Sequence, residues 1–126
     1  MPASHLIAIA VGGAAGATLR GLANAAAVER LNGPLTATVL VNLAGSLLIG
    51  LAVPLLALVS EPWRLLVVTG LLGSLTTFST YNYETVVLLQ NRDYVAAALN
   101  SLGSLIVGLV AVAVGLWIGQ RLAPAG

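Results

Sequence analysis

Four long apolar runs, separated by three short polar connections, dominate this sequence. The runs cover about residues 6–28, 35–59, 63–90 and 94–122. Each run is longer than the ~20 residues that an α-helix needs to cross ~30 Å of hydrocarbon. Because the connections are short, consecutive helices have to run antiparallel, and the first run is expected to end at Glu29, Arg30 and Asn32-Gly33-Pro34. We therefore predict an all-α membrane protein whose 126 residues form a single domain of four transmembrane helices.

The charged residues are too few for a water-soluble protein of this size. They make up 7% of the sequence, whereas 59% is hydrophobic, and a typical soluble domain has about 25% charged residues. The net charge of +1 creates no field that would attract a nucleic acid. Cysteine is absent and His5 is the single histidine, which excludes thiolate metal sites and histidine clusters. We therefore expect no enzymatic activity and no nucleic-acid partner.

The arginines are balanced between the two ends of the predicted bundle. Arg64 and Arg121 fall on the side of the N-terminus, and Arg30 and Arg92 fall on the other side. The positive-inside rule therefore assigns no orientation. One interpretation is that the chain inserts both ways and that two inverted copies form a dual-topology antiparallel dimer. The alternative is a fixed orientation that another feature of the chain determines.

The middle of the third run, from Gly70 to Tyr81, is unusual for a transmembrane helix. It contains two glycines, five serine or threonine hydroxyls and two aromatic rings. We predict that the helix is broken here, near mid-membrane, because irregular backbone at that depth is tolerated where it lines a cavity. The ends of the two half-helices would then present carbonyls to a cation and amides to an anion. The alternative is a continuous packing helix whose hydroxyls bond to their own preceding turn.

Polar side chains form a stripe on each of two further predicted helices. Thr38, Asn42 and Ser46 share one face of the second run, and Asn100 and Ser104 share one face of the fourth. Polar groups in hydrocarbon need partners or water. The stripes therefore predict either hydrogen bonds between helices or a path for a polar solute.

Phe78 and Tyr81 lie three residues apart, so they share a face if the segment stays helical. The edges of aromatic rings are electropositive and can face a small, hard anion. The donors that could complete such a site are Asn42, Thr77, Ser79 and Thr80. The alternative is that the two rings fill the core.

Two charged residues, Arg20 and Glu84, lie inside the predicted spans. Arg20 either supplies a positive potential to an anion vestibule or extends its side chain to the headgroups. Glu84 follows the predicted break by about one turn, where a carboxylate suits a helix N-terminus. It is interpreted either as a partner of Arg20 or as a proton relay.

Small residues recur at four-residue spacing, as in Gly12 and Gly16 and again in Gly115 and Gly119. This spacing lets helix backbones approach closely in lipid. It predicts a tightly packed bundle and says little about function.

Three motifs in the sequence resemble those of the CrcB/Fluc family of small fluoride channels. The first runs from Gly12 to Arg20 and matches the pattern GGxxGAxxR. The second runs from Thr38 to Ser46 and matches TLxVNxxGS, with Val39 in place of the leucine. The third runs from Gly70 to Glu84 and matches GxxGxxTTFSTFxxE, with Tyr81 in place of the second phenylalanine. The resemblance covers all four predicted spans.

The resemblance implies a dual-topology antiparallel dimer that has two fluoride pores and a structural Na⁺ on its axis. It implies passive fluoride export across the cell (plasma or inner) membrane. By motif position, Gly73 and Thr76 would offer backbone carbonyls to the Na⁺, and Phe78 and Tyr81 would flank fluoride. The other residues expected along the fluoride pathway are Thr38, Asn42, Thr77, Ser79, Thr80, Ser104 and Arg20, with Glu84 as a supporting charge.

The chain departs from the family pattern at four positions. Tyr81 replaces a phenylalanine, Asn100 stands where a tyrosine is usual, Gly108 stands where a hydroxyl is often found, and Gly21 stands where an aromatic is common. These departures leave open that the chain functions only as a heterodimer with a paralogous chain. Two different functions also stay open. One is a proton-coupled exporter of small molecules, a class that includes four-span dual-topology dimers, and the second is a non-transporting membrane scaffold.

Overall fold

The computed structural model describes residues 1–30 and 34–124, which form an all-α structure, as predicted. Asn32 and Gly33, which we expected to end the first run, lie outside the described residues. The elements are, in chain order, α1 (Ala3–Arg30), α2 (Pro34–Leu55), α3 (Glu61–Arg64), η1 (Leu65–Leu72), α4 (Gly73–Leu75), α5 (Phe78–Gln90), α6 (Tyr94–Ala98), η2 (Leu99–Gly103) and α7 (Ser104–Leu122). The segments η1 and η2 are π-helical, and each continues directly into the α-helical residues on both sides.

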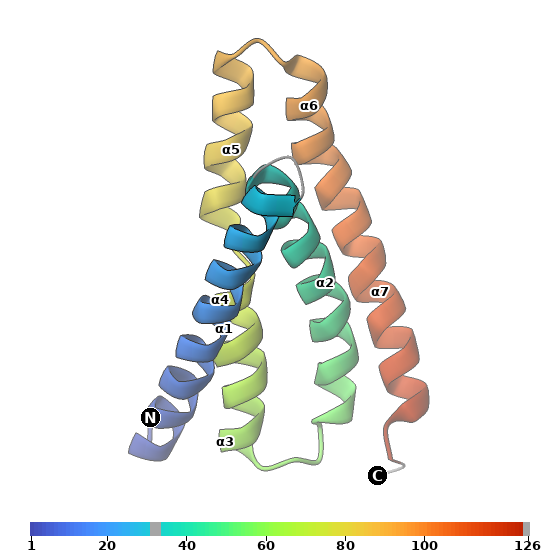
Figure 1. Cartoon of the computed structure of the whole chain (residues 1–126). Coiled ribbons are helices and arrows are strands. Elements are labelled where there is room, and N and C mark those ends of the chain that lie inside the picture. The colour runs from blue at the N-terminus through green and yellow to red at the C-terminus, as the bar shows by residue number, and fades with distance from the viewer. Residues whose placement is uncertain (31–33, 125–126) are drawn as a thin grey trace.

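Figure 1 shows these helical runs arranged as an antiparallel bundle. The N-terminus, the α2–α3 connection and the C-terminus lie at its lower end, and the α5–α6 connection lies at its upper end. The most extensive packing is that of α2 along α7 and of α1 along η1. The bundle is therefore built from two closely packed helix pairs.

Within residues 1–30 and 34–124, three helical runs are long and apolar enough to cross a membrane. They are Ala3–Arg30, Thr36–Leu55 and Tyr94–Leu122. Large apolar side chains cover their outer surfaces, as in α7, where Leu105 and Ile106 are exposed. This distribution suits a bundle that is surrounded by lipid or by another copy of the chain rather than by water.

The second helix ends earlier than predicted. We expected the span to reach residue 59, but α2 ends at Leu55. Pro54 has no N–H for the carbonyl one turn before it, which weakens the last turn of the helix. The chain then turns, with the Ala57 N–H donating to the Pro54 carbonyl at 3.2 Å. Because the residues up to Val59 are apolar, hydropathy does not locate this end.

In the third run the helix is interrupted at Thr76 and Thr77. Thr76 has φ −82° and ψ 157°, and Thr77 has φ −149° and ψ 120°, so both residues have extended backbone. Their β-branched side chains favour this conformation. The Thr76 hydroxyl donates back to the Leu72 carbonyl at 3.0 Å. As a result, α4 ends at Leu75 and α5 begins at Phe78.

Glycines allow the two helix pairs to pack with their backbones in contact. A Cβ atom on Gly12 or Gly16 would overlap the carbonyl oxygen of Leu66 or Leu71 in η1. The α2–α7 pair has the same arrangement, since a Cβ atom on Gly115 would overlap a backbone carbonyl of α2. The four-residue glycine spacing therefore marks close helix packing, as the sequence predicted.

The connection between α5 and α6 is stabilised by a tight helix cap. Arg92 has a positive φ of 61°, and its N–H donates to the Leu89 carbonyl at 3.0 Å. The Asp93 N–H donates to the Leu88 carbonyl at 3.0 Å, which completes a Schellman motif. The Asp93 carboxylate then accepts from the Ala96 N–H at 3.1 Å and caps α6. This turn puts a non-glycine residue in the left-handed region, where glycine is usual.

Replacing Gly16 by alanine is expected to destabilise the bundle. The added methyl group would meet the Leu71 carbonyl of η1, which is backbone and cannot rotate away. We expect Gly16→Ala to lower the free energy of unfolding by ~1–3 kcal/mol, as overpacking does elsewhere. A denaturant titration in mixed micelles measures this change. Gly21→Ala on the same helix is the control, because nothing lies within 4 Å of its Cβ position; equal stability of the two variants would contradict the prediction.

Candidate functional site

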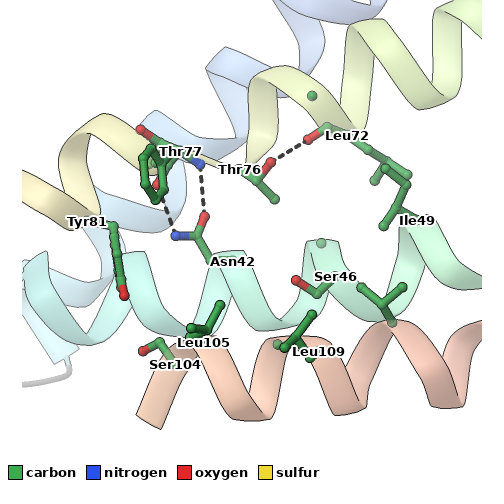
Figure 2. A pocket seen from close by; sticks show the side chains of 15 residues that line it. Asn42, Ser46, Ile49, Leu72, Thr76, Thr77, Tyr81, Ser104, Leu105 and Leu109 are labelled. Carbon is green, nitrogen blue, oxygen red and sulfur yellow. Dashed lines mark hydrogen bonds between the residues drawn. The ribbon is translucent and has the colours of Figure 1, made fainter. Parts of the chain in front are cut away.

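A cavity of about 370 Å³ lies beside the interruption in the third run, between it, α2 and α7. Its polar lining consists of Asn42, Ser46, Thr76, Thr77, Tyr81 and Ser104. The remaining wall is formed by glycines, by the Phe78 ring and by aliphatic side chains, including those of α7. Figure 2 shows this arrangement, with Asn42 extending from α2 to the interrupted segment and Leu105 and Leu109 on the opposite side.

Asn42 holds the interrupted segment through both polar groups of its side chain. Its Nδ2 atom donates to the Thr77 carbonyl at 3.0 Å, and its Oδ1 atom accepts from the Thr77 N–H at 2.8 Å. In a continuous helix the same N–H would donate to the Gly73 carbonyl. Asn42 therefore replaces a helical hydrogen bond at the interruption, and one N–H of its Nδ2 atom is left for another acceptor.

Hydroxyl groups gather at the first turn of α5. The Thr77 Oγ1 atom accepts from the Thr80 N–H at 3.3 Å and so caps the helix. The same oxygen lies 3.1 Å from the Thr80 Oγ1 and 3.4 Å from the Ser79 Oγ. The first turn of a helix has N–H groups without helical partners and a positive dipole end. This end of α5 therefore favours negative charge.

Phe78 and Tyr81 form a stacked aromatic pair. Their ring centroids are 5.8 Å apart, and the ring planes make an angle of 24°. The Phe78 side chain is 76% exposed in the single chain, whereas the Tyr81 hydroxyl donates to the Ser101 carbonyl at 2.6 Å. One ring is thus anchored to a neighbouring helix, and the other projects from the surface of this chain.

The two charged residues of the spans have separate partners. Arg20 donates from Nη1 to the Thr76 carbonyl at 3.2 Å. Glu84 accepts at Oε1 from the Thr38 hydroxyl at 2.7 Å, and its Oε2 is buried with no hydrogen-bond partner among the described residues. The Arg20–Glu84 pair that the sequence suggested is therefore replaced by two contacts with uncharged groups. Arg20 supports the interruption directly, because Thr76 is one of its two extended residues.

The cavity brings together only part of the predicted site. The predicted residues that line it are Asn42, Gly73, Thr76, Thr77, Phe78, Tyr81 and Ser104. Among the described residues, those predicted but absent from its walls are Thr38, Ser79, Thr80, Arg20 and Glu84. The Thr38–Glu84 pair joins α2 to α5, and the hydroxyls of Ser79 and Thr80 contact that of Thr77 at the start of α5.

Sequence reasoning missed three groups that shape this region. Gly45 makes room for Thr76, since a Cβ atom there would overlap the Thr76 Cγ2. The Thr85 hydroxyl accepts from Asn100 at 2.8 Å, and its position one turn after Tyr81 could have suggested a role. The Ser101 carbonyl accepts from Tyr81 inside a π-helical turn, and no side-chain pattern indicates such a turn.

Comparison with known proteins identifies the family. The family profile described as "CrcB-like protein, Camphor Resistance (CrcB)" matches residues 7–116. The chain belongs to the CrcB family.

Its relatives in this family have similar length. The chain is 41% identical over 124 residues to the "Fluoride-specific ion channel FluC" of Chloroflexus aurantiacus, a match that covers 93% of this chain and 96% of that protein. It is 42% identical over 122 residues to the protein of the same name from Shewanella amazonensis, with 94% and 95% coverage. The Serratia proteamaculans protein, also of that name, is 38% identical over 130 residues, with 94% and 98% coverage.

CrcB membership agrees with the apolar helices described above. This chain is a multi-pass protein of the cell membrane. Its named relatives are ion channels and not enzymes, in line with the expectation from composition.

Replacing Asn42 by alanine is expected to weaken the interrupted segment. The Thr77 N–H and carbonyl, which are partly buried, would both lose their partner. We expect a loss of ~1–3 kcal/mol in the free energy of unfolding, the range for polar groups that are left without a partner. A denaturant titration in mixed micelles measures the loss. Ser46→Ala, one turn along the same face of α2 and lining the same cavity, is the matched control. If both variants unfold at the same denaturant concentration, Asn42 does not hold the segment.

Proposed function

We propose that this CrcB protein is a fluoride-selective channel that lets fluoride leave the cell passively. The observation that carries the proposal is the interrupted third run, where an amide, hydroxyls and two aromatic rings converge on one cavity wall. The name "Fluoride-specific ion channel" of relatives at about 40% identity supports the same function.

The chemistry of this wall suits a small anion. Fluoride is strongly hydrated, so its replacement donors have to be numerous and fixed. The Thr77 hydroxyl on this wall is held by contact with the hydroxyls of Thr80 and Ser79, and the free N–H of Asn42 is held in place by its pairing with Thr77. The positive end of α5 and the ring edges of Phe78 and Tyr81 add favourable potential without a full charge. Hydrogen fluoride enters from acidic surroundings and dissociates inside, so an open path suffices for export.

The exposure of the interrupted segment supports an antiparallel dimer. Gly73, Phe78 and Ser79 are exposed in the single chain. Unwound backbone at mid-membrane has to be covered by protein or line a cavity, and a second copy would supply that cover. The balanced arginines permit insertion in both orientations, so we propose that two inverted copies meet here and form two fluoride pores. A paralogous chain could take the place of the second copy.

The interrupted segment also fits a structural Na⁺ on the dimer axis. The Gly73 carbonyl is released from its helical partner, because the Thr77 N–H donates to Asn42 instead. The Thr76 carbonyl accepts from Arg20 at 3.2 Å and keeps a second lone pair. Both carbonyls lie at the C-terminal end of the first half of the third run, where the helix dipole favours a cation. Two such carbonyls from each subunit would hold the ion.

The proposed channel predicts rapid release of fluoride from liposomes that contain this chain alone. A fluoride electrode measures the release, and a chloride electrode measures chloride in parallel. Phe78→Ile removes the aromatic quadrupole but keeps an apolar side chain at this position, so the dimer should fold while fluoride flux falls by at least about tenfold, or ~1.4 kcal/mol in the barrier. Leu89→Ile, an exposed apolar residue of the same helix, is the control. Undiminished flux in Phe78→Ile would contradict the pore assignment.

A proton-coupled exporter is the second candidate, because the unpartnered Oε2 of Glu84 could carry a proton. Neutral hydrogen fluoride crosses a bare bilayer, so a pH gradient accumulates some fluoride in liposomes that contain no protein. For a passive channel we expect no accumulation above this protein-free level, either in the parent chain or in Glu84→Gln, and Glu61→Gln at the start of α3 is the control. Accumulation above the protein-free level by the parent that disappears only in Glu84→Gln would favour the exporter.

A further inference from the structure

A group of four residues ties α5 to η2 next to the aromatic pair. We call it the Tyr81 clasp, and it consists of Tyr81 and Thr85 on α5 and of Asn100 and Ser101 on η2. The Tyr81 hydroxyl donates to the Ser101 carbonyl at 2.6 Å. The Asn100 Nδ2 atom donates to the Thr85 hydroxyl at 2.8 Å and lies 3.4 Å from the Tyr81 carbonyl. The two helices are therefore joined by side-chain bonds in both directions.

Asn100 fixes the backbone that carries Tyr81. It is 4% exposed, and its Oδ1 atom is buried with no partner in the part of the chain that the structure describes. Because this oxygen has no partner, the Asn100 amide can stabilise the clasp only through the bonds of its nitrogen. The Thr85 hydroxyl that accepts from this nitrogen donates in turn to the Tyr81 carbonyl at 2.9 Å. The Thr85 hydroxyl and the Asn100 Nδ2 atom therefore both point to the carbonyl of Tyr81. The ring of Tyr81 lines the cavity.

The hydroxyl of Tyr81 fixes the other end of the same residue. Its single hydrogen is directed at the Ser101 carbonyl, so it is not a donor to an ion in the cavity. The wider turn of a π-helix shifts the helix's own hydrogen bonds by one residue, and Ser101 lies in such a turn. With its backbone and its hydroxyl both held, the long axis of the Tyr81 ring has one direction.

The held ring in turn orients Phe78. The two rings are stacked at a centroid distance of 5.8 Å, and Phe78 is otherwise 76% exposed in the chain. Within one chain, Phe78 packs on Tyr81, and Tyr81 is bonded to η2, so the position of the Phe78 ring depends on η2. A shift of the Tyr81 ring would move both aromatic edges on the cavity wall.

We propose that Tyr81 is a positioning residue for ion selection, and that it acts through the clasp and not as a direct ligand. The clasp fixes the ring edges at the separation that a small anion requires, and a loosened pair would admit larger anions. This inference rests on the proposed fluoride channel function. It applies to this chain in particular, in which Tyr81 and Asn100 stand in place of the phenylalanine and tyrosine of the family pattern and each bonds to the helix of the other.

Tyr81→Phe tests the proposal, because it removes one oxygen and keeps the ring. In liposomes we expect the ratio of chloride to fluoride permeability to rise by about threefold or more, the factor that corresponds to losing one typical interhelical hydrogen bond in a membrane protein. The matched control is Tyr83→Phe, which removes a hydroxyl from a 70% exposed ring two residues away and should keep the parent ratio. A merely structural clasp would lower stability in Tyr81→Phe without changing this ratio. An unchanged ratio in a folded Tyr81→Phe protein overturns the proposal.

Asn100→Leu tests the other half of the clasp with a side chain of similar size. We expect the same change in the permeability ratio, and we expect the double variant with Tyr81→Phe to show no larger change than the stronger single variant, because the two residues act on one ring. Fully multiplicative effects would show that they act independently and would overturn the clasp.

Infrared spectroscopy of the chain with ring-labelled tyrosine separates failure of the clasp from failure of the proposed function. The sequence has only three tyrosines, so the C–O stretching band lost in Tyr81→Phe can be compared with that lost in Tyr83→Phe. We expect the Tyr81 band at the frequency of a phenol that donates to a carbonyl. If the parent carries no fluoride, the channel proposal fails and the selectivity role fails with it, even where the band shows an intact clasp. A Tyr81 band identical to that of the exposed Tyr83 overturns the clasp whatever the flux.

Discussion

The pairing of the Asn42 side chain with the Thr77 backbone is the interaction on which the site depends. A helix interrupted in hydrocarbon exposes a donor and an acceptor that water cannot satisfy. Asn42 satisfies both at 2.8 and 3.0 Å and thereby allows two residues of extended backbone. The cap of α5 by Thr77 follows from this conformation, and so does the position of the aromatic pair in the next turn.

The reach of Asn42 depends in turn on close helix packing. Gly12 and Gly16 bring α1 against η1, and Gly50 and Gly115 bring α2 against α7, in each case without room for a Cβ atom. At Gly45 the missing side chain leaves the space that the Thr76 methyl group occupies. These glycines thus set the distance over which α2 meets the interrupted segment, so the position of the polar site depends on close backbone packing.

Much of this architecture was predictable from the sequence. The features that were not predictable have identifiable physical reasons. Apolar runs locate the helices, because hydrophobicity over ~20 residues is a strong signal. The end of α2 at Leu55, however, lies within apolar sequence, so hydropathy does not reveal it. The stripe containing Asn42 indicated a polar face but not that its partner is backbone. Opposite charges suggested a link between Arg20 and Glu84, whereas each residue contacts an uncharged group instead, a carbonyl for Arg20 and a hydroxyl for Glu84. The π-helical turns have no signature in residue type.

The left-handed residue at the α5–α6 connection is subject to two opposing demands. Local folding favours glycine at position 92, since a side chain in that conformation costs ~1 kcal/mol. The same residue, however, is one of the four arginines that give the two ends of the bundle equal numbers of positive charges. A glycine there would relax the turn and at the same time leave the opposite end with the greater positive charge. In a chain that inserts in both orientations, backbone strain at this turn would therefore be the energetic cost of keeping the two orientations equally populated.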